Sequence, residues 1–282
     1  MQNKTDHKDL MQQIDKECLV DNSVNIDYPP VALSIGKKYI RTKDGGEMLP
    51  LALGTYGNFS FVQSPPKTKK TFFISLLSSV YISGQNNFGG DIRGHRTNQC
   101  LIHIDTEQGF WHSQRTFKRA IDMSNMDGSQ CYYTYALRQI GFKQRIDFIE
   151  YLLKDKDNNT GLLIIDGIAD LVSAINNLEE SNDCVKKMME WSDIYKCHII
   201  TVIHSNYGSS KPTGHLGSFL EKKCETQIEL EANTVNKEWV TVKCKRSRGY
   251  AFETFSFKIN DLGLPEIVGD LYDPLKENEK RY

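Results

Sequence analysis

The segment from Ser64 to Thr71, SPPKTKKT, contains residue types that can bind phosphate groups and a metal ion. It lies between an apolar run and a helical pattern, so backbone amides at the start of that helix can face an anion. The Lys70 ammonium can neutralise a terminal phosphate, and the Thr71 hydroxyl can bind magnesium. The chemistry that this segment indicates is binding of a polyphosphate together with Mg²⁺.

The same segment matches the last two positions of the phosphate-loop pattern G-x-x-x-x-G-K-S/T, known as Walker A. Ser64 and Lys69 replace its two glycines, so the usual source of backbone freedom is missing. The segment is therefore either a phosphate-binding loop with additional positive charge or a basic surface loop before a helix. In the first interpretation the nucleotide is bound by Ser64, Pro65, Pro66, Lys67, Thr68, Lys69, Lys70, Thr71 and Phe72.

Polar side chains follow three other apolar runs along the chain. Glu107 can orient and deprotonate an attacking water, and Asp166 can hold a magnesium-bound water. His204 can hydrogen-bond a γ-phosphate and respond to its loss. Each residue alone has an ordinary alternative, a helix cap for the carboxylates and a polar strand end for the histidine. Their occurrence in this order after Lys70 favours a nucleotide site.

The residues that must position these groups alternate between strand and helix patterns. The sequence predicts strands at 58–62, 100–104, 161–165 and 198–203, and helices at 71–83, 110–122, 142–153 and 182–195, the last with a cap signal at Ser181 and Asn182. Such alternation predicts the α/β class, with a mostly parallel twisted sheet flanked by helices. Strand patterns at 239–243 and 252–259 predict a C-terminal antiparallel extension.

The carboxyl ends of parallel strands meet at one edge of a sheet, and ligands of open α/β sheets bind there. The sequence therefore predicts that Asp105, Glu107, Asp166 and His204 share one cleft with the Lys70 loop.

Local composition divides the chain into three parts. Residues 1–30 are polar and aperiodic, and predict an arm or linker with at most one short helix, or disorder. Residues 31–270 form the principal domain, since 282 residues with 39% apolar side chains can bury one substantial core. Residues 271–282 are a charged tail.

Charge and cysteine content exclude several classes of protein. The net charge is −1, from 35 basic and 36 acidic residues, so any contact with DNA must come from a local patch. The seven cysteines are scattered without a C-x-x-C pair, which argues against a disulfide framework or a zinc site. The polar start is unlike a signal peptide, and no apolar run reaches about 20 residues. We expect a cytoplasmic protein without a membrane span.

Several of these segments resemble the RecA-like P-loop ATPases, in particular the RepA and DnaB group of hexameric helicases. The resemblance covers roughly residues 45–268 and includes a degenerate Walker A motif. Its most specific pieces are LIHIDTEQ, LLIIDGIADL, IHSN, GHLGSFLEKKCETQIELE and VKCKRSRGYAFETFSFKINDLGLP. The resemblance implies a RecA-like ATPase domain at 31–270 that hydrolyses ATP with Mg²⁺ in clefts between the subunits of a homo-oligomer, a hexamer in that group.

The resemblance also implies roles for two basic segments. Lys245, Arg246 and Arg248 fall where such proteins place a lysine and an arginine finger, which stabilises charge on the γ-phosphate of the adjacent subunit. Lys211 and His215, in the loop at 207–215, are expected to contact single-stranded DNA. The alternatives are a plain basic hairpin and a surface loop without ligand. The aromatic run Tyr132, Tyr133 and Tyr135 could stack on bases, but its alternation favours the core.

The function expected from these patterns is an ATP-dependent DNA motor, a helicase or helicase-like ATPase in the replication or transfer of a plasmid, phage or other mobile element, working with replication partners. One alternative is a nucleotide-binding scaffold on DNA that does not hydrolyse ATP, because both loop glycines are missing. The other is a RecA-like regulatory ATPase that acts on proteins, which the near-zero net charge permits.

Overall fold

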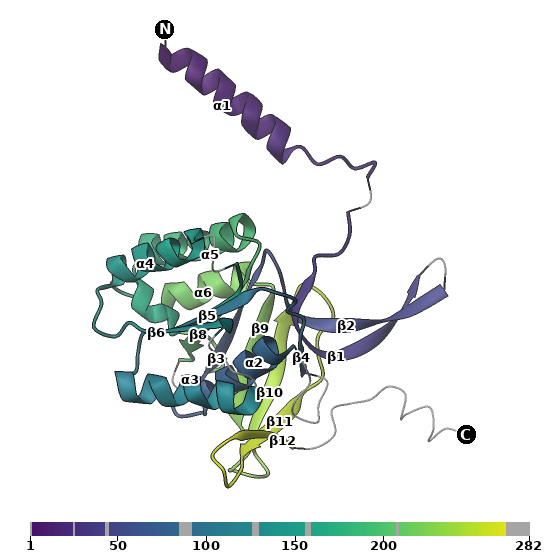
Figure 1. Ribbon diagram of the computed structural model, residues 1–282, viewed down its shortest axis with the longest axis vertical. Coiled ribbons are helices and arrows are strands. Elements are labelled where there is room, and N and C mark those ends of the chain that lie inside the picture. Colours follow the sequence, from purple (N-terminus) through teal and green to yellow (C-terminus); the bar gives the residue numbers. More distant parts are fainter. Residues whose placement is uncertain are drawn as a thin grey trace.

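The computed structural model describes residues 2–24, 26–42, 45–84, 92–125, 130–155, 159–206 and 209–268. The centre of this described part is a nine-stranded sheet (Figure 1). From one edge to the other its strands are β12 (Pro265–Val268), β11 (Phe255–Ile259), β10 (Val240–Ser247), β9 (Thr226–Ala232), β3 (Phe59–Ser64), β8 (His198–His204), β7 (Thr160–Asp166), β5 (Cys100–Asp105) and β6 (Tyr132–Ala136).

The order and direction of these strands confirm the predicted α/β class. Strands β9, β3, β8, β7, β5 and β6 are mutually parallel, and β10, β11 and β12 continue the sheet as antiparallel neighbours. Strand β8 lies between β3 and β7, so the Lys70 loop and Asp166 belong to strands that are not hydrogen-bonded to each other. The carboxyl ends of the parallel strands nevertheless meet at one edge.

Helices cover both faces of this sheet, as expected for mostly parallel strands (Figure 1). One face carries α2 (Lys70–Ser83) and α3 (Phe110–Ser124), and the other carries α4 (Phe142–Lys154), α5 (Leu178–Ile194) and α6 (Gly214–Lys223). Strand β7 shows how the two cores form. Its Leu162 and Ile164 side chains pack with α2, whereas Leu163 and Ile165 pack in the cluster that includes residues of α4, α5 and α6.

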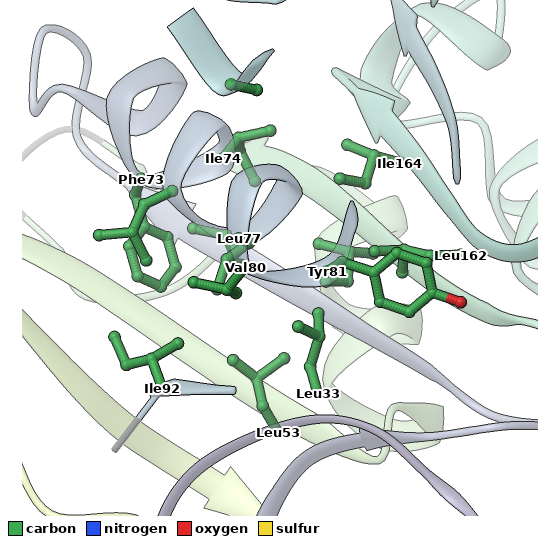
Figure 2. Packing of buried hydrophobic residues seen from close by; sticks show 14 of the residues in the cluster. Leu33, Leu53, Phe73, Ile74, Leu77, Val80, Tyr81, Ile92, Leu162 and Ile164 are labelled. Carbon is green, nitrogen blue, oxygen red and sulfur yellow. The ribbon is translucent and has the colours of Figure 1, made fainter. Parts of the chain in front are cut away.

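Helix α2 is enclosed by a second sheet that the strand patterns did not predict. Strands β1 (Val31–Thr42), β2 (Gly45–Thr55) and β4 (Ile92–Gly94) form it in the order β2-β1-β4. Leu33, Leu53 and Ile92 of this sheet belong to the same buried cluster as Phe73, Leu77 and Val80 of α2 and as Leu162 and Ile164 of β7 (Figure 2). Helix α3 also contacts α2, where the Ser75 hydroxyl donates to the Thr116 carbonyl at 3.2 Å. All residues from Phe73 to Ile82 are buried.

Two helix boundaries differ from the expectation. Helix α1 (Gln2–Cys18) spans 17 residues, longer than the one short helix expected at most, and Figure 1 shows it apart from the rest of the protein. Helix α5 begins at Leu178, because the Asn177 side chain accepts a hydrogen bond from the Glu180 amide at 3.2 Å. The division at residues 30 and 270 stays a prediction, and the expected tail lies outside the described residues.

Two findings concern membrane-spanning helices and metal-binding side chains among the described residues. None of the described helices has both the length and the apolar character of a membrane span. The residues that the structure describes also contain no group of three or more His, Cys, Asp or Glu side chains that could hold a metal ion by themselves.

Enclosure of α2 leads to a stability prediction. Leu77 is 0% exposed, so Leu77→Ala leaves a cavity and should lower the free energy of unfolding by about 2–5 kcal/mol. Leu262 is 82% exposed, and Leu262→Ala should change it by about 0.5 kcal/mol or less. Urea denaturation of both variants measures the difference. Equal losses in the two variants would contradict the described packing of α2.

Candidate nucleotide-binding site

The loop between β3 and α2 turns sharply with lysines in the left-handed conformation. Lys67 has φ 63° and Lys69 has φ 58°. Lys69 occupies the position of the second motif glycine, so the backbone conformation that glycine normally serves is adopted here by a lysine. This conformation costs roughly 1–2 kcal/mol for a residue with a side chain. Lys69 therefore adopts a strained conformation at the position where the motif has glycine.

The same loop leaves the start of α2 open to an anion. Neither a side-chain cap nor an acidic residue is present in the first turn of α2. The Lys69 ammonium does not contact the helix start and donates instead to the Glu238 carbonyl at 2.7 Å. Amides at a helix start carry partial positive charge and bind phosphate.

Lys70, the first residue of α2, contacts the end of strand β8. Its ammonium donates to His204 Nδ1 at 2.8 Å. Burial lowers the pKa of Lys70, and the charges of Glu107 and Asp166 partly oppose that effect. The ammonium is thus partly dehydrated and faces acidic groups from two other strand ends.

Glu107 follows β5 and lies on the other side of His204. Its Oε1 is 3.8 Å from His204 Nε2, an ion pair when the imidazole is protonated. The neighbouring His204 lowers the pKa of Glu107 and the Lys70 ammonium lowers it further, although burial acts in the opposite direction. Glu107 is therefore held ionised, the state in which a carboxylate can orient a water and accept its proton.

Asp105, which the sequence placed in the cleft, turns instead toward its own loop. Its Oδ1 accepts hydrogen bonds from the amides of Glu107 at 3.0 Å and Gln108 at 2.9 Å, and its Oδ2 accepts one from the Ser113 hydroxyl at 2.9 Å. The prediction that Asp105 shares the cleft is therefore wrong, because this carboxylate is used within its own turn and against α3 and does not line the cavity. Asp105 fixes the loop that presents Glu107.

Asp166 ends β7 and is buried beside the two other acids. Burial raises its pKa to about 7, the charges of Asp105 and Glu107 contribute to the increase, and Lys70 opposes it. The next residue, Gly167, leaves room for Glu107, because a Cβ atom there would lie 2.4 Å from Glu107 Oε1. A side chain at position 167 would therefore push the Glu107 carboxylate aside.

A cavity of about 460 Å³ joins these groups, within the usual size range of ligand sites. Thr71 and Asp166 supply the oxygen ligands that Mg²⁺ prefers, and phosphate and water would supply the rest. The residues present therefore fit a magnesium nucleotide. The cavity is lined by Lys67, Thr68, Lys69, Lys70, Thr71, Phe72, Glu107, Gln108, His112, Arg115, Thr116, Arg119, Asp166 and His204. Ser64, Pro65 and Pro66 precede this lining in the loop.

Two arginines of the lining were missed by sequence reasoning. Arg115 and Arg119 lie one turn apart on α3, and the Arg119 guanidinium is 3.8 Å from the centre of the Phe72 ring. The signal was available, since i and i+4 residues share a helix face and α3 follows Glu107. Five lining cations, these arginines with Lys67, Lys69 and Lys70, exceed the two lining carboxylates and favour an anionic ligand.

The three basic residues expected to act on a neighbouring subunit do not line this cavity. Lys245 donates to Glu229 Oε1 at 3.0 Å and to the Ser210 carbonyl. Arg246 is exposed on β10, and the Arg248 guanidinium donates to the Lys223 carbonyl at 2.8 Å. The Arg248 amide donates to the Glu225 carbonyl, and the Glu225 amide donates to the carbonyl of Phe59, the first residue of β3. Arg248 therefore lies near the amino-terminal ends of the parallel strands, whereas the Lys70 loop lies at their carboxyl ends.

The expected DNA contacts are both exposed. Lys211 lies in the loop after β8, whereas His215 is the second residue of α6 rather than a loop residue. Residues 207 and 208 of this loop lie outside the described part. The Tyr132 hydroxyl bonds His103 Nδ1 at 2.8 Å in the core, and Tyr135 packs edge-on against Phe148. The core interpretation of these tyrosines is therefore supported.

Comparison with solved structures identifies the architecture. The chain is similar to the crystal structure of the RadB recombinase, with a TM-score of 0.55 and 17% identity over 76% of this chain and 92% of that one. At this identity the similarity shows the fold, so the predicted RecA-like α/β fold is confirmed. No protein-family model and no curated protein sequence matches the chain.

The left-handed lysine gives a matched pair of substitutions. Lys69→Gly and Lys69→Ala both remove the hydrogen bond to Glu238, but only glycine relieves the strain at φ 58°. The glycine variant should be more stable than the alanine variant by about 1 kcal/mol, measured by urea denaturation. Equal stability would show that position 69 is not left-handed in solution.

Asp166 makes stability depend on pH. Its pKa in the folded protein, about 7, lies above the ordinary value of 3.8, so the folded state binds this proton more tightly and stability falls as pH rises between these values. Asp166→Asn removes that loss. Its free energy of unfolding relative to the wild type should increase from about pH 4 to about pH 8, by up to about 4 kcal/mol. The exposed Asp193→Asn is the control, and a flat difference for Asp166→Asn would contradict the raised pKa.

Proposed function

We propose that the protein is an ATP-dependent motor that acts on DNA, a helicase or helicase-like ATPase. One observation carries this proposal, namely that Lys70, Glu107, Asp166 and His204 converge on one cavity at the carboxyl edge of a RecA-like sheet. The excess of lining cations supports a polyphosphate ligand.

In this proposal each lining residue has one task. The amides at the start of α2 and the Lys70 ammonium would bind the phosphates of ATP, while the Thr71 hydroxyl and the Asp166 carboxylate would hold Mg²⁺. When bound there, the metal ion would supply neutralisation of charge on the phosphate oxygens. Glu107 would orient a water and accept a proton from it. The water oxygen would attack the γ-phosphorus, and the bond between the γ-phosphorus and the β–γ bridging oxygen would break, with ADP as the leaving group.

Lys70 and His204 also explain how the site could report its ligand. Their hydrogen bond of 2.8 Å joins the phosphate loop to the end of β8. A γ-phosphate that attracts the Lys70 ammonium would free His204 Nδ1, which could then take up a proton from water and donate it in a hydrogen bond to that phosphate. His204 is thus proposed as the sensor of the triphosphate.

The positions of the basic residues support action between subunits. Arg248 lies at the amino-terminal ends of the parallel strands, away from its own cavity, and its exposed guanidinium would have to leave the Lys223 carbonyl to reach the cavity of a second copy of the chain. We propose that Arg246 or Arg248 is the finger in a homo-oligomer, a hexamer by the resemblance. Lys211 and His215, both exposed, would contact single-stranded DNA. The structural neighbour is described as a recombinase, which agrees with DNA as the partner.

A second candidate is a scaffold that binds nucleotide on DNA without hydrolysing it. The strained lysines at positions 67 and 69 favour it, because strain in the phosphate loop could impair turnover. Multiple turnovers of ATP by the wild-type chain would exclude this scaffold. Binding of ATP and Mg²⁺ in calorimetry without turnover would support it. A role in replication or transfer of a mobile element, with replication partners, belongs to the motor proposal.

The motor proposal predicts distinct outcomes for three substitutions. Lys70→Ala should abolish DNA-stimulated ATPase activity, and Glu107→Gln should lower kcat by on the order of 10²–10⁴-fold. Gly167→Ala should lower kcat in the same manner with ATP binding retained, because its Cβ displaces the Glu107 carboxylate. Phosphate-release assays and calorimetry measure these effects.

The control for that series is Gly141→Ala. A Cβ at Gly141 would meet its nearest described neighbour at an ordinary distance of 3.6 Å, so turnover should stay at the wild-type level. Full turnover in both Lys70→Ala and Glu107→Gln would refute the mechanism.

A further inference from the structure

A chain of buried polar side chains connects the phosphate-loop strand to the loop after β8. Gln63 and Gln227 are 0% exposed and belong to the adjacent strands β3 and β9. Gln227 Nε2 donates to Gln63 Oε1 and to Glu221 Oε1, both at 2.9 Å. Gln63 Nε2 in turn donates to Glu229 Oε1 and to the Ser210 carbonyl, both at 2.7 Å.

Lys245 of β10 completes this network with a charge. Its ammonium donates to the same two acceptors as Gln63, the Glu229 carboxylate and the Ser210 carbonyl. The Lys245 side chain is 22% exposed and that of Glu229 is 14% exposed, so this ion pair is largely shielded from water. Moving the ammonium away would leave a mostly buried carboxylate without its cation, which is costly. Lys245 is therefore held within its own chain.

The Ser210 carbonyl lies in the middle of a short loop that is also fixed at its ends. The Thr213 amide and hydroxyl donate to the His204 carbonyl at 3.0 and 2.6 Å, and the Asn206 amide donates to the Lys211 carbonyl at 2.8 Å. Gln63 directly precedes Ser64, the first residue of the phosphate loop. The loop that carries Lys211 is thus bonded to two strand ends of the nucleotide site.

We propose that Lys245 is a positioning residue that acts within its own chain, tying the Lys211 loop to the end of β3, and that it is not part of the finger. The functional consequence rests on the proposed function, since this hydrogen-bond network would transmit changes at the phosphate loop to a loop that binds DNA. It assigns the finger to Arg246 or Arg248, whose side chains lack this buried ion pair.

Amide hydrogen exchange on the nucleotide-free full chain tests the tie without any reference to turnover. Lys245→Met should accelerate exchange at the Asn206 and Thr213 amides by about tenfold, because the Ser210 carbonyl keeps only the Gln63 amide of its two side-chain donors. The exposed neighbour Arg246→Met is the matched control and should leave both amides at the wild-type rate. Equal exchange in Lys245→Met and the control would overturn the proposal.

A second variant guards against a failure to fold. Lys245→Met leaves the Glu229 carboxylate unpaired, whereas the double variant Lys245→Met with Glu229→Gln has no unpaired charge and still deprives Ser210 of the ammonium. It should show the same faster exchange at Thr213. Wild-type exchange in the double variant would also overturn the proposal.

Mixed oligomers then separate an anchor from a finger. In an equal mixture of Lys245→Met and Glu107→Gln chains, some Lys245→Met subunits, whose Glu107 is intact, lie next to a subunit whose Lys245 is intact. If Lys245 acted as a finger between subunits, DNA-stimulated turnover of the mixture would exceed the mean of the separate chains. We expect no such gain, and a gain of threefold or more would overturn the anchor role. A wild-type chain without turnover would remove the proposed function while leaving the exchange test valid.

Discussion

The site depends on the electrostatic balance between the Lys70 ammonium and the acids opposite to it. Burial alone would favour a neutral lysine and neutral carboxylic acids, and the opposite charges of Glu107 and Asp166 partly compensate for it. The balance is incomplete for Asp166, whose pKa rises to about 7. A magnesium ion would compensate the carboxylate of Asp166, and the phosphates would compensate the excess of lining lysines and arginines.

The enclosure of α2 makes the balance possible. Ten consecutive residues, Phe73 to Ile82, are buried among the main sheet, α3 and the β1–β2–β4 sheet, so the helix start has a fixed direction. Strain of roughly 1–2 kcal/mol at a left-handed lysine is small beside the burial of so many apolar side chains. A rigid helix thus holds the loop in a conformation that glycine would otherwise make easy.

The strand ends around the cavity divide the work between contact and support. Glu107, Asp166 and His204 face the cavity, whereas Asp105 holds the Glu107 loop by three hydrogen bonds. Gln63 has a supporting role like that of Asp105, because it does not contact the cavity and donates a hydrogen bond to the Ser210 carbonyl in the loop after β8. In the proposed motor these supports would let a change at the phosphates move loops rather than single side chains.

The sequence determined the parallel sheet, the order of its helices and most of the cavity, because hydrophobic periodicity and strand-end polarity are local patterns. Glu107, Asp166 and His204 could be predicted to meet since parallel strands end at one edge. The tertiary structure alone decided that Asp105 supports the loop and that Lys245 pairs with Glu229. The physical reason is that the direction of a side chain and its burial depend on neighbours distant in the sequence, which no local spacing encodes.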